Sequence, residues 1–148
     1  MNLDLFQRLR QHVIDHPLEL HMARWKSTQS RVSPCGTTCC LAGRAIELSE
    51  DSVERCRQDN RSESNTASTY LGIYPAEGWD LFHVDEWPDD LRLEYERLEG
   101  MSMLTGLPGK LRRRMSLRRV AELQAALAVQ VLDRFIAKKS GPGQAPCA

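Results

Sequence analysis

Apolar residues recur along this chain at steps of three and four, the spacing of one face of an α-helix. The longest run covers residues 116–139, and residues 2–16 show the same period. The two stripes consist of Val120, Leu123, Leu127, Val131 and Phe135, and of Phe6, Leu9 and Val13. No alternating run is long enough to predict a strand. The pattern therefore predicts a mainly α, compact single-domain bundle of about five to six helices with irregular connections.

Prolines and small residues mark the expected helix boundaries. Pro17 ends the first helix, while Pro75 and Pro88 are each placed as the opening residue of another, the second running to Gly100. Residues 39–48 are expected to form a buried helix, because the small residues there let another backbone approach closely.

Polar and glycine-containing stretches predict the connections. Residues 49–69 are almost entirely polar, which favours a short surface helix at 52–58 and otherwise a mobile loop. Residues 100–109 are expected to connect two helices. Residues 140–148 carry glycine and proline without a large apolar side chain, which predicts a flexible tail after a single domain at 1–139.

Composition agrees with one compact domain. The chain has 148 residues, of which 41% are hydrophobic and 27% charged, close to the average for a globular protein. No apolar stretch approaches the roughly 18 residues of a membrane span, and Met1 leads into a charged amphipathic segment rather than a signal peptide. We therefore expect a cytoplasmic protein that does not enter membranes.

Five cysteines are present, and three of them, Cys35, Cys39 and Cys40, lie within six positions. A secreted disulfide framework normally has an even number spread along the chain. We interpret these cysteines as reduced thiols. Simple packing in the core is an equally good interpretation, because free cysteine is among the most buried residue types.

One functional hypothesis is a cysteine-dependent enzyme. A thiol at a helix start meets unpaired backbone amides, which lower its pKa and make it more nucleophilic. A nucleophile also needs a base, and His83, closely followed by an acid, is preferred over the other histidines. The candidate catalytic residues are Cys35, Cys39, Cys40, His83, Asp85 and His21.

A second hypothesis uses the same side chains as zinc ligands. Cys35, Cys39 and Cys40 would need a fourth ligand, which Cys56, His21 or His83 could provide. However, the paired C-x2-C spacing is absent, and three cysteines on one turn cannot all face one ion without an irregular backbone. Packing therefore remains the default, and no cofactor or metal is predicted.

Charge is strongly polarised along the chain. Residues 75–100 hold nine acids against two arginines, a net charge of −7, whereas residues 110–139 hold nine bases against two acids, a net charge of +7. The basic segment predicts a surface for an acidic protein or nucleic acid. Its candidate binding residues are Lys110, Arg112, Arg113, Arg114, Arg118 and Arg119.

Two alternatives qualify this interpretation. The acidic and basic helices could lie side by side within one chain, or pair across a homodimer, with each exposed ion pair contributing under about 1 kcal/mol.

Trp25, Trp79 and Trp87 are each expected in the core. However, Trp87 lies in an acidic run, Asp85–Asp89, that could present its aromatic ring to a partner.

A group of residues in the first hundred positions resembles a known pattern. It comprises Met22 and Trp25, then Cys35-Gly36-Thr37-Thr38-Cys39-Cys40-Leu41-Ala42-Gly43-Arg44-Ala45, then Leu81-Phe82 and Trp87-Pro88. This combination is similar to small uncharacterised proteins of bacteria and their phages that share a CGTxxCxAGxA core. The resemblance implies a compact helical domain and a mobile-element context, but no established activity. Arg44 stands where the pattern has an aromatic residue.

The sequence favours a small binding or regulatory protein, such as an inhibitor or accessory factor, over an enzyme. No helix-turn-helix spacing, RNA-binding motif or phosphate loop accompanies the basic segment. A protein partner is therefore expected, with nucleic acid and a homodimer as alternatives. The cysteine-dependent enzyme and the zinc-stabilised binding domain remain competing hypotheses.

Overall fold

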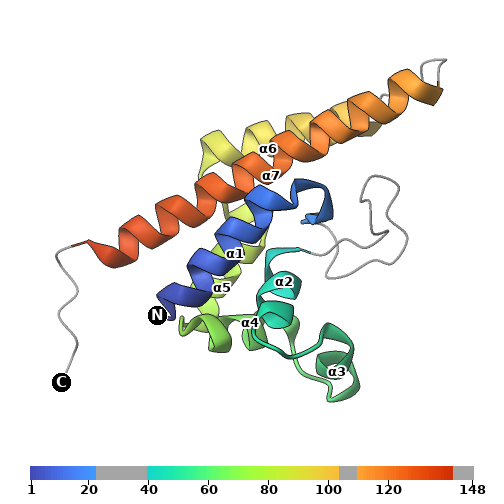
Figure 1. Cartoon of the computed structure of the whole chain (residues 1–148). Coiled ribbons are helices and arrows are strands. Elements are labelled where there is room, and N and C mark those ends of the chain that lie inside the picture. Colours follow the sequence, from blue (N-terminus) through green and yellow to red (C-terminus); the bar gives the residue numbers. More distant parts are fainter. Residues whose placement is uncertain (23–39, 104–109, 142–148) are drawn as a thin grey trace, which may run out of the picture.

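The computed structural model describes residues 1–22, 40–103 and 110–141, with side chains for all of these except 101–103 and 110–116 (Figure 1). In this part of the chain every regular element is a helix, which confirms the mainly α prediction. The α-helices are α1 (Leu3–Asp15), α2 (Leu41–Leu48), α3 (Val53–Gln58), α4 (Glu63–Leu71), α5 (Pro75–Phe82), α6 (Asp89–Met103) and α7 (Lys110–Ser140), and the short 3-10 helices are η1 (Pro17–Glu19) and η2 (Val84–Glu86).

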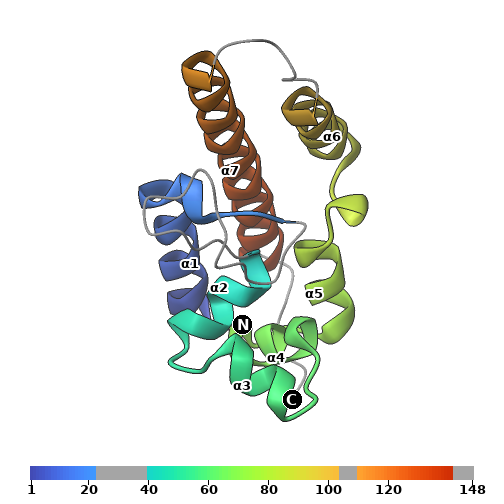
Figure 2. The same cartoon turned by 90° about the vertical axis from the view of Figure 1, so that its right-hand side faces the viewer.

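The long helix α7 organises the fold. It packs against α1 on one side and α6 on another, while α2, α4 and α5 pack against one another in succession. Figures 1 and 2 both show α6 and the first part of α7 lying side by side and extending beyond the other helices. We call this pair of helices the arm. Helix α3 lies at the opposite end of the molecule.

The core lies between α1, α2, α4, α5, α6 and α7, each of which contributes buried residues. Phe6 of α1 is fully buried and stacks on Phe135 of α7, with ring centroids 5.5 Å apart. The predicted stripes supply much of this core, although Leu123 on the arm is partly exposed. The largest fully buried side chains include Phe6, Leu9, Leu41, Ile46, Leu71, Leu81, Leu98 and Leu132.

The prediction of a mobile loop is wrong for its second half, which forms α4 and contributes to the core. Ser62 caps this helix by accepting a hydrogen bond from the backbone N–H of Asn65. Ser68 is fully buried, and its hydroxyl donates to the carbonyl oxygen of Ser64 at 2.8 Å. A serine that satisfies its hydroxyl within its own helix can be buried, so polar composition alone does not exclude a packed helix. The predicted short helix is confirmed as α3.

Two other boundaries differ from expectation. The predicted connection starting at Gly100 is wrong at its beginning, because α6 continues to Met103. Helix α7 begins at Lys110 rather than near 116, and it ends at Ser140, the first residue of the predicted tail. The rest of that tail, including Cys147, lies outside the described residues.

The beginning of the chain is attached to α4. Asn2 caps α1 through its side chain, and its backbone N–H donates to the carbonyl oxygen of Leu71 at 2.7 Å. Gly72 makes this approach possible. Its φ of +64° favours glycine, and a Cβ at this position would lie 3.2 Å from the nitrogen of Asn2.

Asp51 joins the end of α2 to the two helices that follow. Its carboxylate accepts hydrogen bonds from the hydroxyl of Tyr70 at 2.6 Å, from Arg61 at 3.1 Å and from the backbone N–H of Ser52 at 2.8 Å. The Tyr70 hydroxyl, then the Ser52 amide, and Arg61 all favour the charged form. Together they lower the pKa of Asp51 to about 2.

We expect Asp51→Asn to lower the melting temperature at pH 7. Because the pKa of Asp51 is depressed in the folded state, the native protein binds fewer protons than the unfolded chain, so the carboxylate stabilises the fold above pH 3.8. This contribution is lost as the pH falls to about 2, where the melting curves of the variant and the parent should converge. Asp59→Asn, which removes a more exposed acid beside the same Arg61, is the control. A constant difference at every pH would contradict this role.

Candidate functional site

The described thiol of the cysteine turn is Cys40, and it does lie at the start of a helix. It caps α2, and its Sγ accepts a hydrogen bond from the backbone N–H of Gly43 at 3.4 Å. The expected lowering of its pKa is nevertheless wrong. Cys40 is buried in the core, and burial raises its pKa to about 11 despite the nearby amides. Cys40 is therefore protonated at neutral pH.

The other candidate catalytic residues are spread over several elements. Cys35 and Cys39 lie outside the described residues. His21 is exposed after η1, Asp85 is exposed in η2, and His83 follows the last residue of α5. Within the described ranges, no group of three or more histidine, cysteine, aspartate or glutamate side chains is arranged to hold a metal ion. The proposed fourth zinc ligand Cys56 is buried in α3.

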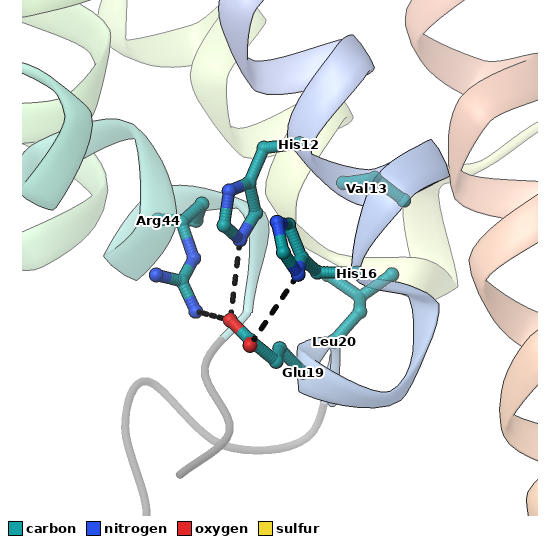
Figure 3. Close-up of a pocket in the computed structure, with 6 residues that line it drawn as sticks. All are labelled: His12, Val13, His16, Glu19, Leu20 and Arg44. Atoms are coloured by element: carbon teal, nitrogen blue, oxygen red, sulfur yellow. Dashed lines mark hydrogen bonds and ion pairs between the residues drawn. The ribbon is translucent and has the colours of Figure 1, made fainter. Parts of the chain in front are cut away.

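The sequence interpretation missed a polar cluster between α1, η1 and α2, which Figure 3 shows. The Glu19 carboxylate is shared by three side chains. Nε2 of His12 lies 3.3 Å from Oε2, Nδ1 of His16 lies 3.7 Å from Oε1, and a guanidinium nitrogen of Arg44 donates to Oε2 at 2.9 Å. Arg44 also donates to Glu47 at 3.1 Å. The sequence does carry a signal for this cluster, namely two histidines one helical turn apart followed by an acid three residues later.

This cluster is a closed ion-pair network rather than an open site. The lining side chains leave no room for a water molecule between them. Burial, followed by the positive Arg44 and the neighbouring His16, lowers the pKa of His12 more than Glu19 raises it. His12 is therefore neutral near pH 7, and Arg44 already neutralises the carboxylate that a bound cation would need. The cluster joins α2 to the end of α1.

The acidic and basic segments pair within one chain near the C-terminal part of α7. Arg134 makes two hydrogen bonds to the carboxylate of Asp90, at 2.6 and 2.9 Å, and Lys139 pairs with Glu77. These contacts connect α7 to the acidic helices α6 and α5. The alternative that the two segments lie side by side in one chain is therefore confirmed for this part of the segment.

The first part of α7 differs. Arg118 and Arg119 expose 67% and 70% of their side chains, and both pair with the single carboxylate of Glu122 on their own helix. The backbone of the other predicted binding residues, Lys110, Arg112, Arg113 and Arg114, forms the beginning of α7 on the arm. Bases are therefore concentrated at the beginning of α7, whereas Arg134 and Lys139 near its end are paired with acids of other helices.

Trp87 lies in the core as expected, so the alternative that it is a binding residue facing a partner is wrong. Trp87 is only 3% exposed, its indole N–H donates to the carbonyl oxygen of Leu81 at 3.1 Å, and its ring packs edge-on against Tyr95. Trp79 was expected in the core, but its side chain lies on the outer face of α5 and is 51% exposed. Trp25 lies outside the described residues.

Comparisons with protein-family models, with curated proteins and with solved structures found no match. No helix in the described part of the chain combines the length and apolar character needed to cross a membrane.

Proposed function

We propose that this chain is a binding or regulatory protein that attaches to an acidic surface of a partner protein through the first part of α7. One observation carries the proposal. Two bases near the end of α7, Arg134 and Lys139, are paired with acids from other helices, whereas Arg118 and Arg119 share one carboxylate of their own helix and remain largely exposed. A role as an inhibitor or accessory factor is consistent with such a surface.

The bases in the first turn of α7, which precede Arg118 and Arg119, also favour binding over stability. Positive charge near a helix N-terminus is unfavourable, because the helix dipole already places partial positive charge there. The first turn of α7 contains bases and no acid. Local features that oppose the fold are typical of functional surfaces, and an anionic partner would remove this conflict.

Neutralising Arg118 and Arg119 together to glutamine should weaken partner binding about three- to tenfold, since each exposed pair contributes up to about 1 kcal/mol. Binding should be titrated against an aspartate- and glutamate-rich peptide and against a short nucleic-acid duplex, at low and high salt. The control is Arg55→Gln with Arg57→Gln on α3, which removes equal charge at the other end of the molecule. Arg55 is as exposed as Arg118.

A weaker interaction with the acidic peptide in the α7 variant alone would support the proposal. Preference for the duplex, with a reduced salt dependence in the α7 variant, would instead identify nucleic acid as the partner. Equal effects of both double variants, or no binding of either probe, would contradict the assignment of this surface.

A further inference from the structure

The outer face of α5 exposes aromatic rings that the fold does not use. Among the described residues, the aromatic side chains with large exposure are Tyr74, at 76%, and Trp79, at 51%, and both belong to this helix or its cap. Large aromatic side chains are usually buried, and those that remain exposed commonly mark interaction sites.

The indole of Trp79 is held in place from one side. The ring of His83, one turn further along, stacks on it with centroids 3.7 Å apart and planes 22° from parallel. This stacking restricts the orientation of the indole before any partner arrives. An aromatic anchor that is already ordered loses less conformational entropy on binding.

The charge around this face is negative and incompletely neutralised. No lysine or arginine occurs between Ser62 and Leu91. Four acids of the stretch have ion-pair partners, namely Glu63 with Arg57, Glu77 with Lys139, Asp89 with Arg92 and Asp90 with Arg134. The other three, Asp80, Asp85 and Glu86, are exposed and have no ion pair among the described residues.

These three acids are close to the exposed indole along the chain. Asp80 follows Trp79 directly, and Asp85 and Glu86 form η2 immediately after the stacked His83. Consecutive Cα atoms are about 3.8 Å apart, so the Cα atom of Asp85 lies within roughly 7.6 Å of the Cα atom of His83. Helix α5 and η2 also contact each other. Unneutralised acids therefore lie next to the exposed Trp79 along the chain, and the indole is stacked on one side.

We propose that this face, formed by Trp79, Asp80, Asp85 and Glu86, docks a basic segment of a partner protein. An arginine or lysine side chain would lie against the indole through a cation–π contact, and the carboxylates would pair with the neighbouring bases of the same segment. The described pockets lie elsewhere, between α1, α2 and η1 and between α1 and α7. Because neither of these pockets lies at the Trp79 face, the face suits a protein segment better than a small molecule. This face is separate from the basic surface of α7, so the chain would carry two docking faces of opposite charge.

The probe for this proposal is a short arginine-rich peptide, added to the full chain at low salt. The indole N–H resonance of Trp79, identified by its loss in Trp79→Phe, should shift on addition, whereas that of buried Trp87 should not. Trp79→Ala should weaken binding about tenfold, the effect of removing a modest aromatic anchor. The triple variant Asp80→Asn, Asp85→Asn and Glu86→Gln should weaken it by at least as much.

A matched control removes the same charge elsewhere, through Asp15→Asn, Glu50→Gln and Asp59→Asn, all of them exposed. Binding should then be retained. An equal loss in this control, or an unmoved Trp79 resonance, would overturn the proposal because the peptide would be responding to net charge alone. Concentration-dependent self-association that Trp79→Ala abolishes would assign the face to a second copy of the chain and would also overturn it. Arg118→Gln with Arg119→Gln should leave peptide binding unchanged.

Discussion

Replacing Phe6 with alanine is expected to lower the free energy of unfolding by about 3–5 kcal/mol. Phe6 is fully buried and stacks on Phe135, so the truncation leaves a cavity where α1 meets α7 and also removes an aromatic contact. For a chain of this size, the melting temperature should fall by roughly 10 °C. Denaturant titration followed by circular dichroism measures the change.

Leu3→Ala on the same helix is the matched control, since Leu3 is 41% exposed and lies outside the core. It should alter stability by less than about 0.5 kcal/mol. A loss below about 1 kcal/mol for Phe6→Ala would mean that α1 does not pack on α7 as described.

Gly78→Ala should lower the free energy of unfolding by about 1–3 kcal/mol, although alanine normally stabilises a helix relative to glycine. The added Cβ would lie 1.8 Å from the hydroxyl oxygen of Ser68 and 3.1 Å from its Cβ. Ser68 can avoid this contact only by breaking its buried hydrogen bond to Ser64 or by moving α4 away from α5. Thermal and denaturant unfolding would both report the loss.

Two further variants isolate the cause. Ser68→Ala removes the hydroxyl, so the double variant with Gly78→Ala should recover part of the loss. Gly100→Ala on α6 has open space around the new Cβ, and it should stabilise the protein by roughly 0.5–1 kcal/mol. Similar effects of alanine at both glycines would show that contact with Ser68 is unimportant.

The sequence predicted those helices whose apolar period is long and uninterrupted. Helices α1, α5 and α7 were recognised from stripes such as Phe6, Leu9 and Val13, and from the position of Pro75. Helix α4 was missed because its buried residues include serine and threonine, which composition assigns to loops. The buried hydroxyl of Ser68 bonds within the helix, and no sequence period shows that.

The functional residues were harder to predict because their roles depend on burial. Trp79 and Trp87 both have acidic neighbours in the sequence, yet Trp79 is half exposed and Trp87 lies in the core. Cys40 begins a helix as expected, but burial reverses the expected direction of its pKa shift. The sequence did locate the positive charge of α7, whereas its partial neutralisation by Asp90 and Glu77 depends on the packing of three helices.

The ion pair between Glu19 and Arg44 has a consequence for how this protein can vary. Glu19 lies in η1 and Arg44 in α2, so this 2.9 Å contact joins two elements that are distant in the sequence. Both side chains are largely buried, so reversing either charge alone would place like charges together in a partly dehydrated position. Substitutions at either position are therefore expected to be limited to side chains that keep the charge.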